Sequence, residues 1–268
     1  MPKIRYSASS TKSKFRGGIF NKKASSFPVV SGGVLHSDGT YYYRKFLTTD
    51  NLVVTGSLVA DILVIGGGGA GGTHGDAGGG GAGTVLYFPT QNLSSQTYLC
   101  TVAEASGNTA QYVWTKDGNP SQFGSLTSAS GGGTGYANSY PSGAHNQTLN
   151  GGAYQAGGGG AGASAVGKTG GSGTNAYSTW ATATSTGVNG YYAGGGSSSR
   201  SPSASSPGGL GGGGVGAPPT YFNNNNGGDA VANTGSGGGG GGNYYYNTGG
   251  SGASGLIIVR YTREQLGG

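Results

Sequence analysis

Short runs of alternating or uninterrupted apolar residues occur in the first half of the chain and at its end. This pattern predicts β-strands, and turn residues such as Asp38-Gly39 and Gly56-Ser57 bound several of the runs. Two runs, 62–65 and 256–259, are apolar at every position, which is typical of strands covered on both faces. We therefore predict that these two runs lie side by side in one sheet. The predicted strands cover residues 41–47, 52–55, 58–65, 84–88, 97–102, 112–114, 122–126 and 256–261.

Runs of glycine lie between and after these strands. The hexad GGGGAG occurs at residues 66, 78 and 157, and GGGGVG occurs at 211, at irregular spacings that exclude a solenoid of fixed period. Six residues make two turns of a polyproline II-type helix, which has no internal hydrogen bonds and offers its amides to neighbours. We predict that such glycine helices pack side by side. The alternative is a flexible Gly/Ser linker, which the strands on both flanks disfavour.

The amino-acid composition limits which interactions can stabilise the folded domain. Of the 268 residues 64 are glycine, and hydrophobic residues make up only 33%. Ordering a glycine costs roughly 0.5–1 kcal/mol more than ordering an alanine, whereas a backbone hydrogen bond contributes about 1 kcal/mol net. We therefore expect backbone hydrogen bonds, rather than a large side-chain core, to stabilise the body. The predicted fold is all-β: a small β-sheet or sandwich plus a glycine-rich bundle with polyglycine II-like helices and irregular loops, with almost no α-helix.

The positive net charge of +6 comes from the beginning of the chain. Residues 1–37 contain seven basic and no acidic residues, which leaves seven basic against eight acidic residues over the rest. We predict a basic N-terminal anchoring arm over 1–37, a glycine-rich β domain over 38–262 and a C-terminal tail over 263–268. Such an arm suits nucleic acid or a negative protein surface, and its interleaved aromatic residues favour the protein surface. The predicted anchoring residues are Lys3, Arg5, Tyr6, Lys12, Lys14, Phe15, Arg16, Phe20, Lys22 and Lys23.

Residue types that carry chemistry in enzymes form no recognisable site in the sequence. Residues 162–169 match the phosphate-loop pattern, but glycine runs stand where a strand and a helix would be needed. His36, His74 and His145 lack the spacing of a metal-binding pair. The single cysteine, Cys100, lies in a strand-like run and is predicted to be buried rather than reactive. We predict no enzymatic activity, no cofactor, no metal site and no membrane insertion.

The aromatic residues between the glycine runs are better candidates for function. They lie in segments 134–156, 174–192, 218–226 and 243–247, next to Asn, Ser and Thr. Flat, amphipathic rings on loops suit protein or sugar surfaces at low entropic cost. The alternative is that they cap the glycine bundle and fill gaps between subunits. The candidate contact residues are Tyr136, Tyr140, Tyr154, Tyr177, Trp180, Tyr191, Tyr192, Tyr221, Phe222, Tyr244, Tyr245 and Tyr246.

Four sequence elements in order resemble a known domain. They are ADILVIGGGGAGG at 60–72, GGGGAGTVLYF at 78–88, SQFGSLTSASGGG at 121–133 and GGSGASGLIIVRY at 249–261. Together they resemble the glycine-rich domain of bacteriophage tail fibres and related virion appendages, over roughly residues 40–261. The resemblance implies a virion protein with glycine helices sandwiched together and loops that contact the host surface.

Further expectations follow from the resemblance. The chain is expected to form a homotrimer, to contact other virion proteins through its arm, and to bind a host cell-surface protein or glycan. It would be assembled in the host cytoplasm and exposed on the particle surface. Two other functions stay open: a capsid or tail decoration or fibre-assembly protein with a purely architectural role, and an extracellular ice-binding or matrix protein. The last predicts a flat Thr-rich face and a secretion signal, and the sequence contains neither.

Overall fold

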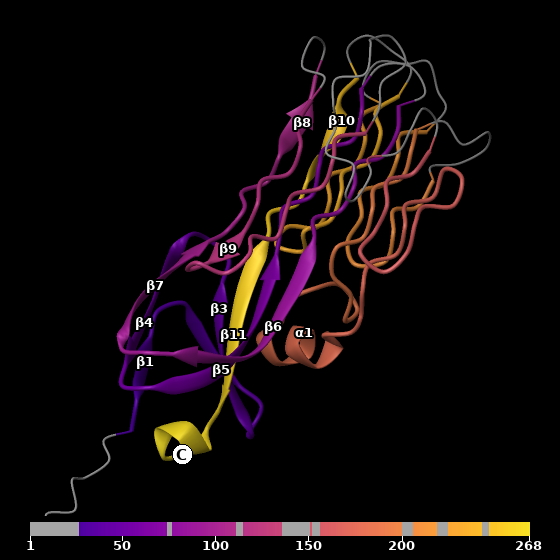
Figure 1. Ribbon diagram of the computed structural model, residues 1–268. Coiled ribbons are helices and arrows are strands. Elements are labelled where there is room, and N and C mark those ends of the chain that lie inside the picture. The colour runs from indigo at the N-terminus through magenta and orange to yellow at the C-terminus, as the bar shows by residue number, and fades with distance from the viewer. Residues whose placement is uncertain are drawn as a thin grey trace, which may run out of the picture.

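The protein consists of a β-sandwich from which a bundle of extended glycine-rich segments continues in one direction (Figure 1). The computed structural model describes residues 27–73, 77–110, 115–135, 151, 156–199, 206–218, 225–242 and 247–268. Over these residues the predicted all-β fold is confirmed, with one short α-helix, α1 (Ser178–Thr184), and one 3₁₀ turn, η2 (Glu264–Leu266). The strands are β1 (Val29–Ser31), β2 (Val34–Ser37), β3 (Tyr41–Phe46), β4 (Asp50–Thr55), β5 (Leu58–Ile65), β6 (Val85–Leu93), β7 (Gln96–Thr101), β8 (Gly107–Thr109), β9 (Gln122–Phe123), β10 (Gly249–Gly252) and β11 (Leu256–Thr262).

Two antiparallel sheets make up the sandwich. One has five strands in the order β2-β3-β11-β5-β6, and the other has four in the order β1-β4-β7-β9. β5 and β11 are direct neighbours, with Leu256 opposite Ile65 and Val259 opposite Ile62. Residues 62–65 and 256–259 are all buried, so the predicted pairing of the two apolar runs is confirmed.

Apolar side chains cover both faces of the five-stranded sheet. Between the sheets, Leu52 and Val54 of β4 pack with Ile62 and Val64 of β5. On the other face, Trp180 of α1 packs with the alternate residues of β5 and β11. The side-chain core is therefore more substantial than the overall composition predicted, because nearly all the buried large aliphatic residues are concentrated in these strands.

The glycine segments bond to their neighbours with a period of three residues. In the segment 66–72, successive amides donate to three different neighbouring segments in turn, and every third amide returns to the same one. These neighbours are 78–84, 116–119 and 250–253. The N···O distances are 2.9–3.0 Å. A chain with three residues per turn points its amides in three directions about its axis. The predicted polyglycine II-like helices are thus present, and each helix is bonded to several others rather than to two strands of a sheet.

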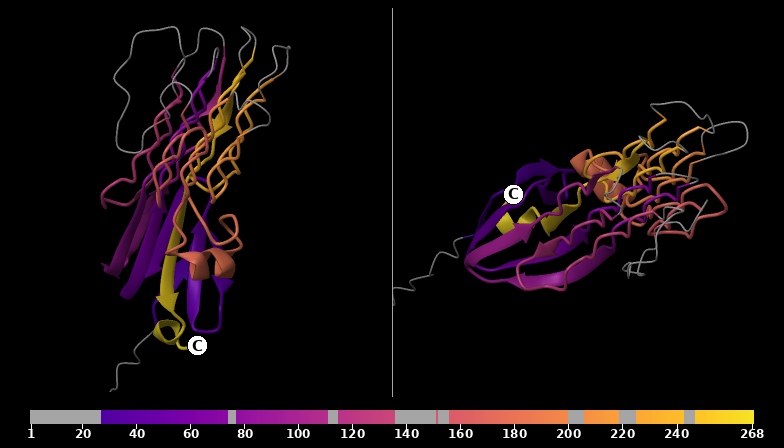
Figure 2. Two further views of the ribbon diagram at one scale, coloured as in Figure 1. Left: turned by 90° about the vertical axis from the view of Figure 1, so that its right-hand side faces the viewer. Right: turned by 90° about the horizontal axis from the view of Figure 1, so that it is seen from above.

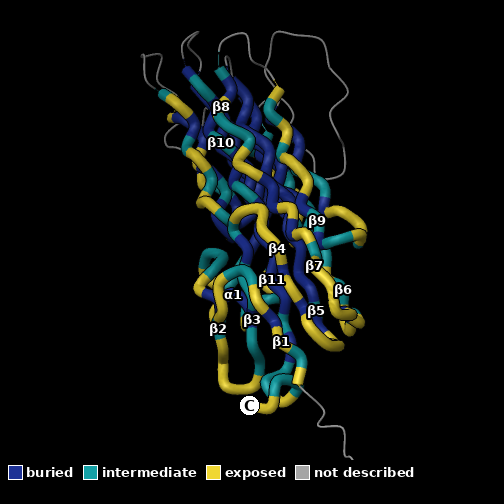
Figure 3. Tube along the Cα trace, turned by 90° about the vertical axis from the view of Figure 1, so that its left-hand side faces the viewer, coloured by how far each residue is buried: buried dark blue, intermediate teal, exposed yellow. Residues whose placement is uncertain are grey.

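The segment 234–242 is buried throughout, like most of the interior of the bundle (Figure 3). Residues 237–242 donate backbone hydrogen bonds to three other segments and accept them from three more. Because six neighbours surround one segment, the bundle is packed in three dimensions. The donor bonds run to 194–197, 69–72 and 225–228, and the acceptor bonds come from Gly80, Gly250 and the segment 214–217.

Glycine is required in the bundle because the segments approach one another at backbone contact distance. A Cβ atom added to Gly80 would lie 2.1 Å from the carbonyl oxygen of Gly69, and one on Gly237 would lie 1.9 Å from that of Gly80. No side-chain movement can relieve such a contact, since both partners are backbone atoms. The glycine runs therefore specify how closely the segments pack.

Strands lie within the predicted arm, and the predicted tail packs against the domain. Residues 29–37 were assigned to the arm but form β1 and β2, which pair with β4 and β3. The predicted tail contains η2, whose residue Gln265 makes two side-chain hydrogen bonds, of 2.8 and 3.0 Å, to the backbone of Val59. The predicted strand at 122–126 is shortened to β9, and the one at 112–114 lies outside the described residues.

We expect Gly80→Ala to lower the free energy of unfolding by about 3 kcal/mol or more, since the new methyl group meets backbone on a neighbouring segment. Gly39→Ala is the control: a Cβ there meets nothing within 4 Å, and only the positive φ of +94° opposes it, at about 1–2 kcal/mol. Chemical denaturation followed by circular dichroism measures both. Equal effects of the two substitutions would contradict close packing of the bundle.

Cys100 is fully buried in the sandwich, which confirms its predicted placement. Burial raises the pKa of the Cys100 thiol to about 12, so at pH 8 it stays protonated, whereas an exposed thiol with a pKa of about 8.5 is partly ionised. We expect no reaction with a thiol-specific disulfide reagent in the folded protein and rapid reaction in guanidinium. Rapid labelling of the folded protein would show that the β4–β7 region opens.

Candidate binding site at the end of the glycine bundle

Several stretches of the described chain end at the same end of the bundle, opposite the sandwich (Figures 1 and 2). Their last residues before each break are Thr73, Ala110, Ser199, Pro218 and Gly242. Hydrogen bonds connect these residues to one another. The hydroxyl of Thr73 donates to the carbonyl of Asn247, and the amide of Ser199 donates to that of Ala77 at 2.9 Å. The residues that bound the breaks therefore form one surface, which we call the bundle tip.

Buried hydroxyl groups replace missing backbone neighbours at the bundle tip. The Thr109 hydroxyl donates to the Gly71 carbonyl at 2.6 Å and accepts from the Gly249 amide at 3.1 Å. The Thr134 hydroxyl accepts from the Lys116 amide and donates to the carboxylate of Asp117, both at 2.7 Å. Such bonds satisfy backbone groups that would otherwise be buried without a partner. The tip is consequently held in a defined arrangement up to its last described residues.

Eight of the twelve predicted contact residues belong to the sequence segments that interrupt the described chain at the tip. They lie outside the described residues, and their predicted role stays a prediction. They are Tyr136, Tyr140, Tyr154, Tyr221, Phe222, Tyr244, Tyr245 and Tyr246.

The other four predicted contact residues lie at the opposite end of the bundle, beside the five-stranded sheet. Trp180 is 3% and Tyr192 0% exposed, and both belong to the apolar cluster under α1, so their predicted role as surface contacts is wrong. Tyr177 and Tyr191 are half-buried. Segment 174–192 was interpreted as a display loop because its Tyr, Asn and Thr resemble those of the other loops, although its aromatic residues supply the side chains that cover the sheet.

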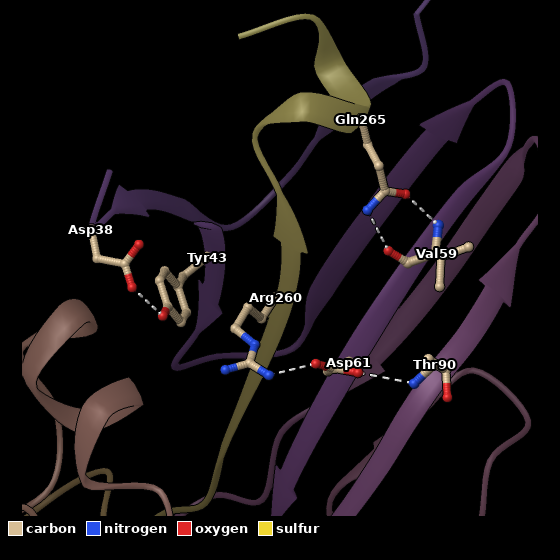
Figure 4. A network of polar contacts seen from close by, with 7 residues as sticks. All are labelled: Asp38, Tyr43, Val59, Asp61, Thr90, Arg260 and Gln265. Atoms are coloured by element: carbon tan, nitrogen blue, oxygen red, sulfur yellow. Dashed lines mark hydrogen bonds and ion pairs between the residues drawn. The ribbon is translucent and has the colours of Figure 1, made fainter. Parts of the chain in front are cut away.

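An arginine held between aromatic rings links α1 to the sheet. The guanidinium carbon of Arg260 lies 4.4 Å from the ring centre of Trp180 and 4.5 Å from that of Tyr41. The same guanidinium donates to the carboxylate of Asp61 at 2.6 Å, and Asp61 also accepts from the Thr90 amide at 2.9 Å (Figure 4). Cation–π contacts and an ion pair together fix the position of Arg260. This cluster connects β3, β5, β6, β11 and α1.

A hydrogen bond beside this cluster, between Tyr43 and Asp38, keeps its protonation state near neutral pH. Burial raises the pKa of the Tyr43 phenol, and the hydrogen bond to the Asp38 carboxylate, 2.7 Å away, raises it further. The pKa of Asp38 is lowered, because its hydrogen bonds from Tyr43 and the backbone outweigh desolvation. Tyr43 therefore remains a neutral donor and Asp38 a charged acceptor. The sequence did not predict this arrangement, although the run Tyr41-Tyr42-Tyr43 within the predicted strand 41–47 was a signal for it.

Backbone amides in and next to the segment that matches the phosphate-loop pattern, 162–169, already donate hydrogen bonds within the bundle. The amides of Gly162 and Ala163 both donate to the Ser172 carbonyl, and the amide of Gly157 donates to Gly167. These amides cannot surround a phosphate while they are paired in this way. Among the described residues no group of three His, Cys, Asp or Glu side chains is placed to hold a metal ion. No helix in the same part of the chain reaches the length and apolar character that a membrane span needs.

A β-sandwich continued by a hydrogen-bonded glycine bundle defines a glycine-rich structural domain. The chain belongs to the family described as the glycine-rich domain, whose sequence pattern matches residues 48–262. The match includes β4, both long apolar strands and all the glycine segments. None of the curated proteins matches the chain.

We expect Trp180→Ala to lower the free energy of unfolding by about 3–5 kcal/mol, as for other large-to-small changes in a core, because the indole packs against Arg260 and the sheet. Thr182→Ala on the exposed face of the same helix should change it by about 0.5 kcal/mol or less. Denaturant titration distinguishes the two. A Trp180 variant as stable as the Thr182 variant would show that α1 is dispensable for the sandwich.

Proposed function

We propose that the protein is a bacteriophage virion appendage, a tail fibre component that is anchored at its sandwich end and recognises the host surface at its bundle tip. The single observation that carries this proposal is the separation of the two ends. The sandwich end holds both ends of the described chain, and the opposite end holds the residues that bound the aromatic-rich segments other than 174–192 (Figure 1).

The arrangement at the sandwich end supports attachment through the N-terminal arm. Phe27, the first described residue, lies next to Gly267 near the C-terminus. The basic residues 3–23 precede Phe27 in the sequence, and Phe27 lies with the C-terminus at the end of the domain opposite the tip. In the proposed function their charge and aromatic rings contact other virion proteins rather than nucleic acid.

The bundle supports a display role because its hydrogen bonds do not depend on the segments at the tip. The central segments 66–73, 77–83 and 234–242 are buried and bonded along their length to other described segments. Sequence changes within 136–150, 219–224 or 243–246 therefore leave those bonds intact. A rigid support with replaceable ends suits a protein that recognises different receptors.

The partners belong to the same proposal. A homotrimer would place three bundle tips side by side, which would raise the avidity for a repeated surface molecule. Tyrosine-rich segments next to Asn and Ser suit either a host protein or a glycan as the receptor. The particle surface is the proposed location of the mature protein.

The test is host adsorption by particles that carry Tyr244→Ala, Tyr245→Ala and Tyr246→Ala together. Large aromatic residues dominate many interfaces, so we expect the adsorption rate to fall by more than about tenfold. Leu99→Ala is the control, because Leu99 is 51% exposed on the outer face of the four-stranded sheet, away from the tip. Copy number per particle is measured for each variant.

Normal adsorption by particles with a normal copy number would overturn a receptor role for this segment. A loss of the protein from the particles, or malformed particles, would instead favour the architectural decoration or assembly role. Deleting residues 1–26 should release the protein from the particle, and retention at full copy number would contradict anchoring by the arm.

A further inference from the structure

A cavity of about 230 Å³ opens at the side of the sandwich, between the β6–β7 hairpin and the turn that follows β9. It is remote from the bundle tip and shares no residue with the aromatic segments. No charged side chain lines it. The lining residues are Gln91, Asn92, Leu93, Ser94, Gln96, Tyr98, Phe123, Ser125 and Leu126.

The floor of the cavity is a fixed part of the sandwich core. Leu93 and Phe123 are 4% and 1% exposed, and Tyr98 and Leu126 pack against the same apolar cluster. The rings of Tyr98 and Phe123 are stacked, with centres 5.3 Å apart and planes inclined by 18°. Leu93 and Phe123 are too deeply buried to touch a ligand, so the apolar surface that a ligand meets comes from the half-buried Tyr98 and Leu126, which the core holds in place before binding.

The rim of the cavity carries carboxamides and hydroxyls with unused hydrogen-bonding capacity. Within the described part of the chain, no hydrogen bond engages the side chains of Gln96 or Ser125. Gln91 uses one donor on the Pro89 carbonyl at 2.8 Å, which leaves its carbonyl oxygen as an acceptor. The Asn92 side chain does not contribute, because it lies on the other face of β6, beside the exposed Val59. A free carboxamide offers two donors and an acceptor. The rim therefore matches a ligand whose neighbouring groups both donate and accept.

A strained bulge directs the rim residues of β6. Two residues, Pro89 and Thr90, stand opposite Asp61 alone, because the β5–β6 register shifts there. Thr90 has a φ of +50°, which is unfavourable for a β-branched residue. The bond from the Thr90 amide to Asp61, which Arg260 holds in place, stabilises this conformation. Bulges and strain of this kind occur often beside binding sites, where they redirect side chains.

We infer that this cavity binds one ring of a neutral saccharide. Sugar hydroxyls both donate and accept hydrogen bonds, as the free carboxamides require, and the C–H face of a sugar ring is apolar, as the floor requires. The absence of charged lining residues disfavours phosphorylated or acidic sugars, because no cation there would compensate their desolvation. The inference is independent of the proposed receptor contact at the bundle tip, and a virion role is not needed for it.

The test is titration of the full-length, ¹⁵N-labelled protein with methyl glucoside, methyl galactoside and N-acetylglucosamine. We expect at least one of the three to shift the side-chain NH₂ signals of Gln91 and Gln96 with saturation in the millimolar range. Glucose 6-phosphate is the charged comparison and should shift neither of them. Gln91→Ala and Gln96→Ala should each weaken binding by about tenfold, the effect of losing one or two hydrogen bonds.

Asn51→Ala is the matched control, because it removes an exposed carboxamide from the same sandwich outside the cavity. It should leave the titration unchanged, and the unfolding midpoints of all variants should match that of the parent. No shift with any neutral sugar at 100 mM, or equal shifts in the Gln91, Gln96 and Asn51 variants, would overturn the inference. Shifts by the phosphate sugar alone would also overturn it, since they would indicate an anion site.

Discussion

The amide-to-carbonyl hydrogen bond between two glycine segments at backbone contact distance is the interaction on which this structure depends. Its direction turns by one third of a circle at each residue, so one segment bonds to a different neighbour with each successive amide. A sheet strand satisfies its backbone in one plane, whereas these segments do so all around. This is why a chain with few large side chains away from its strands has a buried interior there.

The β-sandwich fixes where the glycine segments of the bundle begin. β5 leads directly into the segment at residue 66, β6 follows the segment that ends at residue 84, and β11 follows the segment that ends at residue 255. The order β11-β5-β6 places these three segments next to one another at the top of the five-stranded sheet. Large side chains set the register of the strands, and the glycine segments then continue that register into a region without such side chains.

The strands and the nature of the bundle could be predicted because both depend on local pattern. Uninterrupted apolar runs at 62–65 and 256–259 indicated paired central strands, and the repeated hexads indicated helices of three residues per turn. The placement of segment 174–192 could not be predicted, because Trp180 and Tyr192 differ from loop aromatics only in what they touch. The start of the sandwich was missed for a similar reason: Val29 and Val30 are too short a run to stand out beside a basic arm.

Part of the candidate binding surface could likewise be predicted from the sequence, and part could not. Composition identified aromatic segments between glycine runs, and the topology brings the boundaries of most of them to one end. The side cavity had no sequence signal, since Gln91 and Gln96 look like ordinary polar residues of a hairpin. Their grouping arises from a β-bulge, and a bulge depends on the long-range contact between Asp61 and Thr90 rather than on local propensity.

The glycine lattice is indifferent to chain direction. Segment 237–242 bonds to 69–72, which runs the same way, and equally to 225–228, which runs the opposite way. An extra out-and-back pair of glycine segments could therefore dock on the flank of the lattice in either sense, without altering the base that the sandwich provides. The number of glycine segments can therefore change independently of the sandwich. Duplication of a short glycine hairpin would widen the bundle tip and leave the sandwich unchanged.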